Sequence, residues 1–149
     1  MSNKIEVLNL KSKYSREDHF TIVIDGTPLD RILDHLYPKM NFLGLIPPLA
    51  DWMYIEEEKT ILKERFYSNN LEEMVPVLIC PDDCDLNCTV VIAEVLKQNG
   101  QVIWEKVGLN ISQSVDRIGN NVEWLKKIPA FYFDQKEYFS QLDKIYSRL

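Results

Sequence analysis

Hydrophobic and polar side chains alternate most clearly in two neighbouring stretches near the middle of the chain. Residues 89–97 and 101–108 are rich in β-branched and aromatic residues, which pack well on a pleated sheet. Asn99 and Gly100 lie between them, and this pair accepts the two positive φ angles that a tight type I′ turn requires. The sequence therefore predicts a central β-hairpin.

A two-residue turn also sets the register of the hairpin, and it places Glu94 opposite Glu105. Like charges directly opposite one another destabilise a sheet. Lys97 or Lys106 could reach over the pair, both carboxylates could extend into water, or a basic partner could cover them. The sequence leaves these arrangements open.

The other patterned stretches predict strands and helices that pack around this hairpin. Apolar alternation predicts further strands at residues 5–10, 20–24, 75–80 and 130–133. Apolar residues at helical spacing predict helices over residues 27–37, 56–66 and 134–149, with Thr27 and Asp134 as N-caps. Together these elements predict an α+β fold, in which helices, including a C-terminal helix, pack on one face of a mainly antiparallel sheet.

The segment from Met40 to Tyr54 is apolar and aromatic, and Gly44 and Pro47-Pro48 interrupt it, so it cannot form one regular element. It is either a buried connection over the sheet or an exposed loop that docks a partner, since Trp, Tyr, Phe and Met are favoured at interface centres. Core packing is the more ordinary outcome.

Composition narrows the class of protein. The 149 residues suggest a single domain, 1–149, with a core of ordinary size. The formal net charge of −6 argues against nucleic acid as a ligand, because phosphate contacts need clustered Lys and Arg. An acidic surface instead suits a basic protein partner, whose approach it accelerates.

The expected location is the cytoplasm. The first residues have no apolar core of the signal-peptide kind, and no window is long enough to span a bilayer, so no membrane association is expected. Three cysteines without a secretory context also argue against a disulfide framework.

The cysteines raise the question of a metal. Cys80, Cys84 and Cys88 have C-x3-C-x3-C spacing, which zinc can accept, although no fourth ligand follows nearby. A calcium loop from Asp83 to Glu94 also fits in part, but it lacks the glycine that its sharp turn needs. In the simplest interpretation the aspartates satisfy turn amides and the cysteines are buried, so no cofactor is predicted.

An enzyme is not predicted. The sequence has no GxSxG, P-loop, HExxH or GxGxxG motif. The acids around the cysteines disfavour the thiolate that would act as a nucleophile. A large polar pocket that holds His19 or His35 beside a carboxylate would favour catalysis instead.

Three pieces of the sequence, in order, resemble an uncharacterised group of small bacterial proteins over residues 75–142. The pattern of the group is C-P-x-C-G-D-L-G-C, then V-x-W, then F-x-F-D-x-x-x-Y. The matching residues are Cys80-Pro81, Asp85-Leu86, Cys88, Val102-x-Trp104 and Phe131-x-Phe133-Asp134-x-x-x-Tyr138. The chain departs from the pattern at Asp83, where the group has cysteine, and at Cys84 and Asn87, where it has glycine. The resemblance implies a shared fold and a bacterial, cytosolic origin.

The expected function is that of an acidic binding or inhibitor protein: a bacterial immunity protein that neutralises a basic, nuclease-type toxin. The likeness to immunity proteins lies in size and acidity only. The side chains expected to contact the partner are Asp51, Trp52, Tyr54, Glu56, Glu57, Glu58, Asp82, Asp83, Asp85, Glu94 and Glu105. The alternative is a small metal-binding protein that uses Cys80, Cys84 and Cys88 in a structural or redox role.

Overall fold

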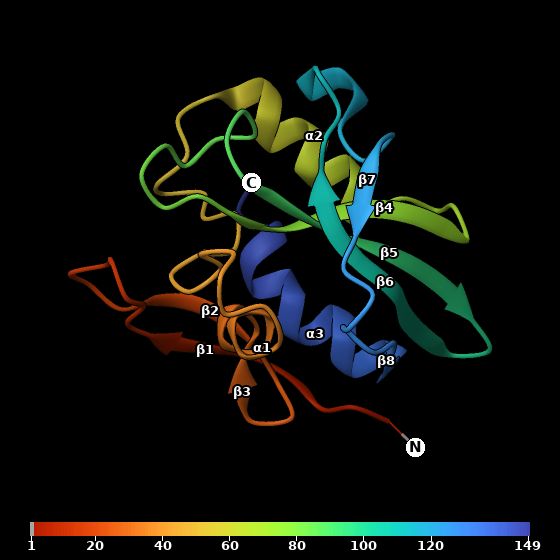
Figure 1. Ribbon diagram of the computed structural model, residues 1–149. Helices are drawn as coiled ribbons and strands as arrows, with labels where there is room; N and C mark the ends of the chain where they lie inside the picture. Colours follow the sequence, from red (N-terminus) through yellow and green to blue (C-terminus); the bar gives the residue numbers. More distant parts are fainter. Residues whose placement is uncertain (1) are drawn as a thin grey trace.

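The structure is a computed structural model that describes residues 2–149. Within these residues, three α-helices pack against two antiparallel sheets (Figure 1), which confirms the predicted α+β class. The smaller sheet has the order β1-β2-β3, with bounds Ile5–Leu10, His19–Ile24 and Thr27–Pro28. The larger sheet runs β4-β5-β6-β7, and β8 also pairs with β6. Its strands are Glu72–Ile79, Val90–Gln98, Gln101–Asn110, Val122–Trp124 and Phe131–Asp134.

The helices are α1 (Leu29–Leu36), α2 (Glu56–Phe66) and the C-terminal α3 (Gln135–Tyr146). A 3-10 turn, η1 (Val115–Arg117), lies in the polar segment before β7. None of the helices in the described part of the chain is long and apolar enough to cross a membrane.

The central hairpin is confirmed, and its turn has the expected backbone. Asn99 and Gly100 have φ angles of 52° and 76°, the positive values that a type I′ turn requires. The register departs from the prediction beyond Val95, where a bulge leaves Glu105 as an extra residue in β6. Glu94 therefore faces Lys106, and the prediction that it faces Glu105 is wrong.

The predicted N-cap of α1 is also wrong. Asp25 and Gly26 adopt positive φ angles of 51° and 85°, and this turn brings Thr27 back to pair with Ile24 as part of β3. The helix consequently begins at Leu29, without a side-chain cap. In α3 the predicted cap is confirmed, because the Asp134 carboxylate accepts a hydrogen bond from the Glu137 N–H at 3.0 Å.

Two apolar cores lie on opposite faces of β5, since successive side chains of a strand alternate. Val91 and Ala93 belong to the larger core, which contains much of α3. Val90 and Ile92 belong to the smaller core, which contains Leu62 of α2. The Met40–Tyr54 segment is mainly a buried connection to these cores, through Phe42, Leu45, Ile46, Leu49 and Met53.

Helix α3 joins the two sheets. Its residues contact β8 and β6 of the larger sheet, and they also lie along β1, the edge strand of the smaller one (Figure 1). The Ile5 N–H donates to Glu137 Oε1 at 3.1 Å, and the Val7 N–H donates to Gln141 Oε1 at 2.9 Å. The outer N–H groups of Ile5 and Val7 are thus satisfied by side chains rather than by another strand.

Candidate functional site

The loop of residues 80–89 joins β4 to β5 just beyond their last paired residues, Ile79 and Val90. Figure 1 shows this green loop beside the yellow segment that leads into α2. The loop turns sharply, because the Cys84 N–H donates to the Cys80 carbonyl at 3.0 Å and Cys84 adopts a φ of 50°. This turn brings the predicted acids of the loop close to those at the start of α2.

Glu58 links the loop to α2. Its Oε1 accepts from the Leu86 N–H at 2.7 Å, and its Oε2 accepts from the Asn87 side chain at 3.4 Å. Only 3% of Glu58 is exposed. Burial raises the pKa of its carboxyl, while the Leu86 N–H lowers it and the charges of Asp85 and Glu57 raise it further. Glu58 is therefore turned inward and lies outside the exposed surface on which the sequence analysis placed it.

Tyr54 lies beside the acids of this loop, of which Asp82 and Asp83 are exposed and Asp85 is buried. Its ring is 69% exposed, and its hydroxyl donates to Asp85 Oδ2 at 3.5 Å, the limit of hydrogen-bond length. The charge of Asp85 is the main reason that the pKa of Tyr54 is raised, with further contributions from burial and from Asp83 and Glu58. The raised pKa reflects the negative potential that the neighbouring carboxylates produce at the hydroxyl.

We call this region the Tyr54 surface. It comprises Tyr54, the buried Asp85 that its hydroxyl contacts, and four exposed acids of α2 and the loop: Glu56, Glu57, Asp82 and Asp83. Within residues 2–149, the ion pairs are Lys59 with Glu56 at 3.3 Å and Lys4 with Glu6 at 3.9 Å. Most carboxylates of the Tyr54 surface therefore have no cationic side chain against them in the described part of the chain.

The remaining predicted contact residues lie elsewhere. Asp51 and Trp52 line a hollow of about 310 Å³ together with Arg148, and the Trp52 ring meets the His19 ring edge-on at 5.3 Å. Glu94 and Glu105 belong to the central hairpin. The predicted set is thus divided among three places on the molecule.

Glu94 is half-buried beside the strand neighbours that set its charge state. Burial raises the pKa of its carboxyl; Lys106 lowers it, and Glu72 and Glu105 raise it again. Of the arrangements left open by the sequence, the structure shows Lys106 opposite Glu94. Glu105 is exposed.

The three cysteines do not come together as one group. The thiols of Cys80 and Cys88 and the carboxylate of Asp83 lie within 4.8 Å of one another. Cys84 instead points inward, where it is 8% exposed and its thiol donates to the Pro81 carbonyl at 3.1 Å. The predicted ligand set of three cysteines is therefore replaced by two cysteines and an aspartate.

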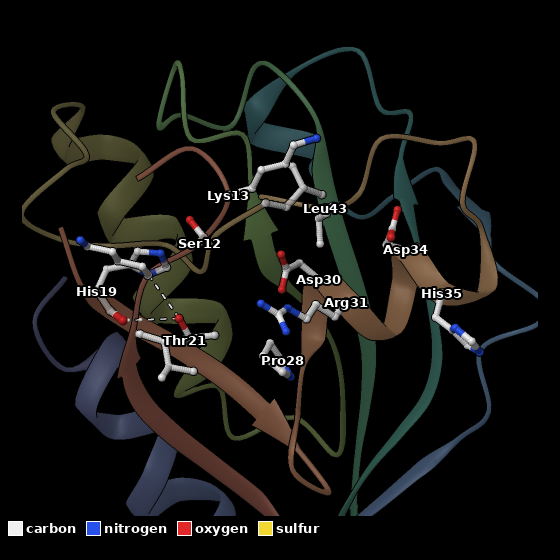
Figure 2. A pocket seen from close by; sticks show the side chains of 13 residues that line it. Ser12, Lys13, His19, Thr21, Pro28, Asp30, Arg31, Asp34, His35 and Leu43 are labelled. Atoms are coloured by element: carbon white, nitrogen blue, oxygen red, sulfur yellow. Dashed lines mark hydrogen bonds between the residues drawn. The ribbon is translucent and has the colours of Figure 1, made fainter. Parts of the chain in front are cut away.

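A second region of interest is a cavity of about 890 Å³ between β2, α1 and the loops beside them. Figure 2 shows His19 and His35 at opposite sides of this pocket, with Asp30 and Arg31 between them. The pocket holds both histidines, but most of its lining surface is apolar, so it differs from the polar pocket that would favour catalysis.

His19 and Asp30 of this pocket bond to the backbone, and His19 and Thr21 also contact each other at 3.4 Å (Figure 2). His19 Nδ1 lies 2.8 Å from the Phe20 carbonyl, which can only accept, so Nδ1 carries the proton. His19 Nε2 is buried and has no hydrogen-bond partner among the described residues. Asp30 Oδ2 accepts from the Gly44 N–H at 2.9 Å. In this structure neither histidine of residues 2–149 forms a hydrogen bond with a carboxylate.

Comparison with known proteins adds no further information, because no family model, curated protein or solved structure matches the chain.

Proposed function

We propose that this protein is an acidic inhibitor of the bacterial immunity type, which binds a basic, nuclease-type toxin through the Tyr54 surface. The observation that carries the proposal is the setting of Tyr54. An aromatic ring that is 69% exposed stands among carboxylates that raise the pKa of its hydroxyl, and no cationic side chain of residues 2–149 forms an ion pair with Asp83 or Asp85.

Such a surface is suited to a Lys or Arg side chain from a partner. The cation can lie over the Tyr54 ring while it pairs with the exposed carboxylate of Asp83, and both contacts become stronger as water is excluded. Exposed tyrosines at the centre of an interface often carry a large part of the binding energy. The Tyr54 surface therefore combines an aromatic anchor with the charges that orient a basic partner.

The net charge of the chain supports the same kind of partner. At −6 it attracts a cationic protein over a distance of about one Debye length and speeds the encounter. A nuclease must carry a cationic surface to hold its phosphate substrate, and carboxylates can occupy that surface in place of phosphates. Blocking the surface would inhibit the enzyme without any chemistry by the inhibitor.

The test is isothermal titration of the purified protein with the product of the gene directly upstream, where a toxin would be encoded. We expect binding that weakens as salt is raised, and loss of the toxin's activity at one equivalent. The variant Tyr54→Ala should lose about 2 kcal/mol, roughly a 30-fold loss of affinity. Glu123→Gln, which neutralises an exposed acid on β7, is the matched control and should bind like the parent.

Absence of binding to the upstream protein would refute the proposed inhibitor function. Equal affinities of Tyr54→Ala and Glu123→Gln would show that a bound partner uses another face of the molecule.

A further inference from the structure

We propose that Cys80, Asp83 and Cys88 form a binding site for a thiophilic divalent cation of the zinc type. This inference is independent of the proposed inhibitor function, because it depends on three ligand atoms and not on the charge of the Tyr54 surface. Asp83 belongs to both regions, so the two hypotheses are tested with different variants.

The geometry is close to what a tetrahedral ion requires. Zinc lies about 2.3 Å from a thiolate sulfur, so two sulfurs on one tetrahedral ion are roughly 3.8 Å apart. The ligand atoms of Cys80, Asp83 and Cys88 all lie within 4.8 Å of one another. Side-chain rotations that move these atoms by about 1 Å would complete the set.

Hydrogen bonds on either side of the three ligand residues hold the backbone of this loop in place. Cys80 directly follows the Ile79–Val90 rung, and Ile79 also exchanges backbone hydrogen bonds with Ile46 at 2.7 and 3.0 Å. Beyond the turn, the Asn87 N–H donates to Asp85 Oδ1 at 3.0 Å, and Glu58 holds the neighbouring Leu86 N–H. Both ends of the ligand loop are therefore fixed before an ion arrives.

The ligand types select the class of ion. Two thiolates and one carboxylate suit borderline or soft ions such as Zn²⁺ and Cd²⁺, whereas Mg²⁺ and Ca²⁺ prefer an all-oxygen set. Binding displaces the two thiol protons to solvent, and no electrons are transferred. The bound unit has a net charge of −1, from one +2 ion and three −1 ligands.

The structure also indicates an open coordination position. Asp83 and Cys88 are exposed and Cys80 is partly exposed, so solvent reaches the site. Three protein ligands with water as the fourth is the arrangement of zinc sites that retain an exchangeable position. Water would hold that position in the isolated protein.

The experiment titrates the full chain with Cd²⁺ and Zn²⁺ in the presence of a phosphine reductant, which keeps the thiols free. Cadmium–thiolate bonds give an ultraviolet charge-transfer band, and calorimetry gives the stoichiometry and affinity for Zn²⁺. The variants are Cys80→Ser, Cys88→Ser and Asp83→Asn. The matched control is Cys84→Ser, which removes a thiol from the same loop but keeps a donor to the Pro81 carbonyl. Circular dichroism confirms that each variant is folded.

We expect one ion per chain and a band of equal height in the parent and in Cys84→Ser. Cys80→Ser and Cys88→Ser should each lose about half of the band, because each removes one of two thiolates. Asp83→Asn should keep the band but weaken Zn²⁺ binding at least tenfold, by analogy with the roughly 10- to 100-fold effect of losing supporting contacts at metal sites.

Three results would overturn the proposal. The first is the absence of a charge-transfer band in the folded parent protein. The second is loss of the band in Cys84→Ser, which would assign the ion to the three cysteines. The third is unchanged Zn²⁺ affinity in Asp83→Asn, which would remove the carboxylate from the site.

Discussion

Replacement of Glu58 by alanine tests whether this residue holds the candidate site together. The change removes the acceptor of the buried Leu86 N–H, which lies 2.7 Å from Glu58 Oε1. A buried amide left without a partner costs about 1–3 kcal/mol of stability. The contact with the Asn87 side chain is long, at 3.4 Å, and adds little.

The control is Glu57→Ala, which removes an exposed carboxylate from the same helical turn. Both variants lose the interaction of one acid with the helix dipole, about 0.3–1 kcal/mol each. The difference between them therefore isolates the buried hydrogen bonds. We expect the free energy of unfolding of Glu58→Ala to be about 1–3 kcal/mol lower than that of Glu57→Ala. Its melting temperature should be roughly 3–10 °C lower.

The assay is urea unfolding followed by tryptophan fluorescence, since the chain contains three tryptophans. If the free energies of unfolding of Glu58→Ala and Glu57→Ala differ by less than about 0.5 kcal/mol, Glu58 behaves like a surface residue and does not hold the loop.

A pH series adds a second readout from the same residue. Burial raises the pKa of Glu58 above its ordinary 4.5, so the folded chain keeps this proton to higher pH than the unfolded chain. Its contribution to stability is complete below pH 4.5 and falls as the pH rises through the folded pKa. Glu58→Gln keeps an acceptor for the Leu86 N–H and cannot ionise. We expect its stability relative to the parent to increase across that window; a constant difference would contradict the assigned burial.

Two further changes test the packing that surrounds the site. Tyr138→Phe removes the acceptor of the buried Trp104 Nε1–H, which lies 3.0 Å away. We expect the free energy of unfolding in urea to fall by about 1–3 kcal/mol. An unchanged free energy would mean that the indole has another partner. Gly108→Ala places a Cβ 2.6 Å from the Glu123 carbonyl, so β6 and β7 must separate. We expect the free energy of unfolding to fall by about 1–3 kcal/mol and the fluorescence of Trp124 to change. A spectrum like that of the parent would contradict the close approach of the two strands.

Local signals in the sequence were enough to predict the hairpin and the C-terminal helix. Asn99-Gly100 determines the turn by its own backbone preferences, and Asp134 caps α3 with its own side chain. The bulge at Glu105 depends on how β6 pairs with its neighbours, so residue alternation alone does not reveal it. The unfavourable pairing of Glu94 with Glu105 was the one sign that the simple register would change.

The site was harder to predict, because spacing along a chain does not determine the direction of a side chain. The C-x3-C-x3-C pattern grouped Cys84 with the other cysteines, but the left-handed backbone at Cys84 accompanies a thiol that points inward. Glu58 carried a usable signal, since it lies one helical turn before Leu62 and two before Phe66, the other buried residues of α2. The helical face that Glu58 shares with Leu62 and Phe66 therefore indicates a buried side chain.

The 890 Å³ cavity carried no comparable signal. His19 comes from β2, and Asp30 and His35 come from α1, so the cavity exists only after the smaller sheet and the helix have packed. Such a space depends on the relative placement of elements, which the pattern of a single sequence does not report.

The contacts between β1 and α3 have a consequence for biosynthesis. Glu137 lies 132 residues after Ile5, so the first strand leaves the ribosome long before the side chain that covers its outer amide has been made. During that interval the strand offers bare N–H groups to any neighbouring chain. The outer edge of β1 is therefore closed only after α3 has been made.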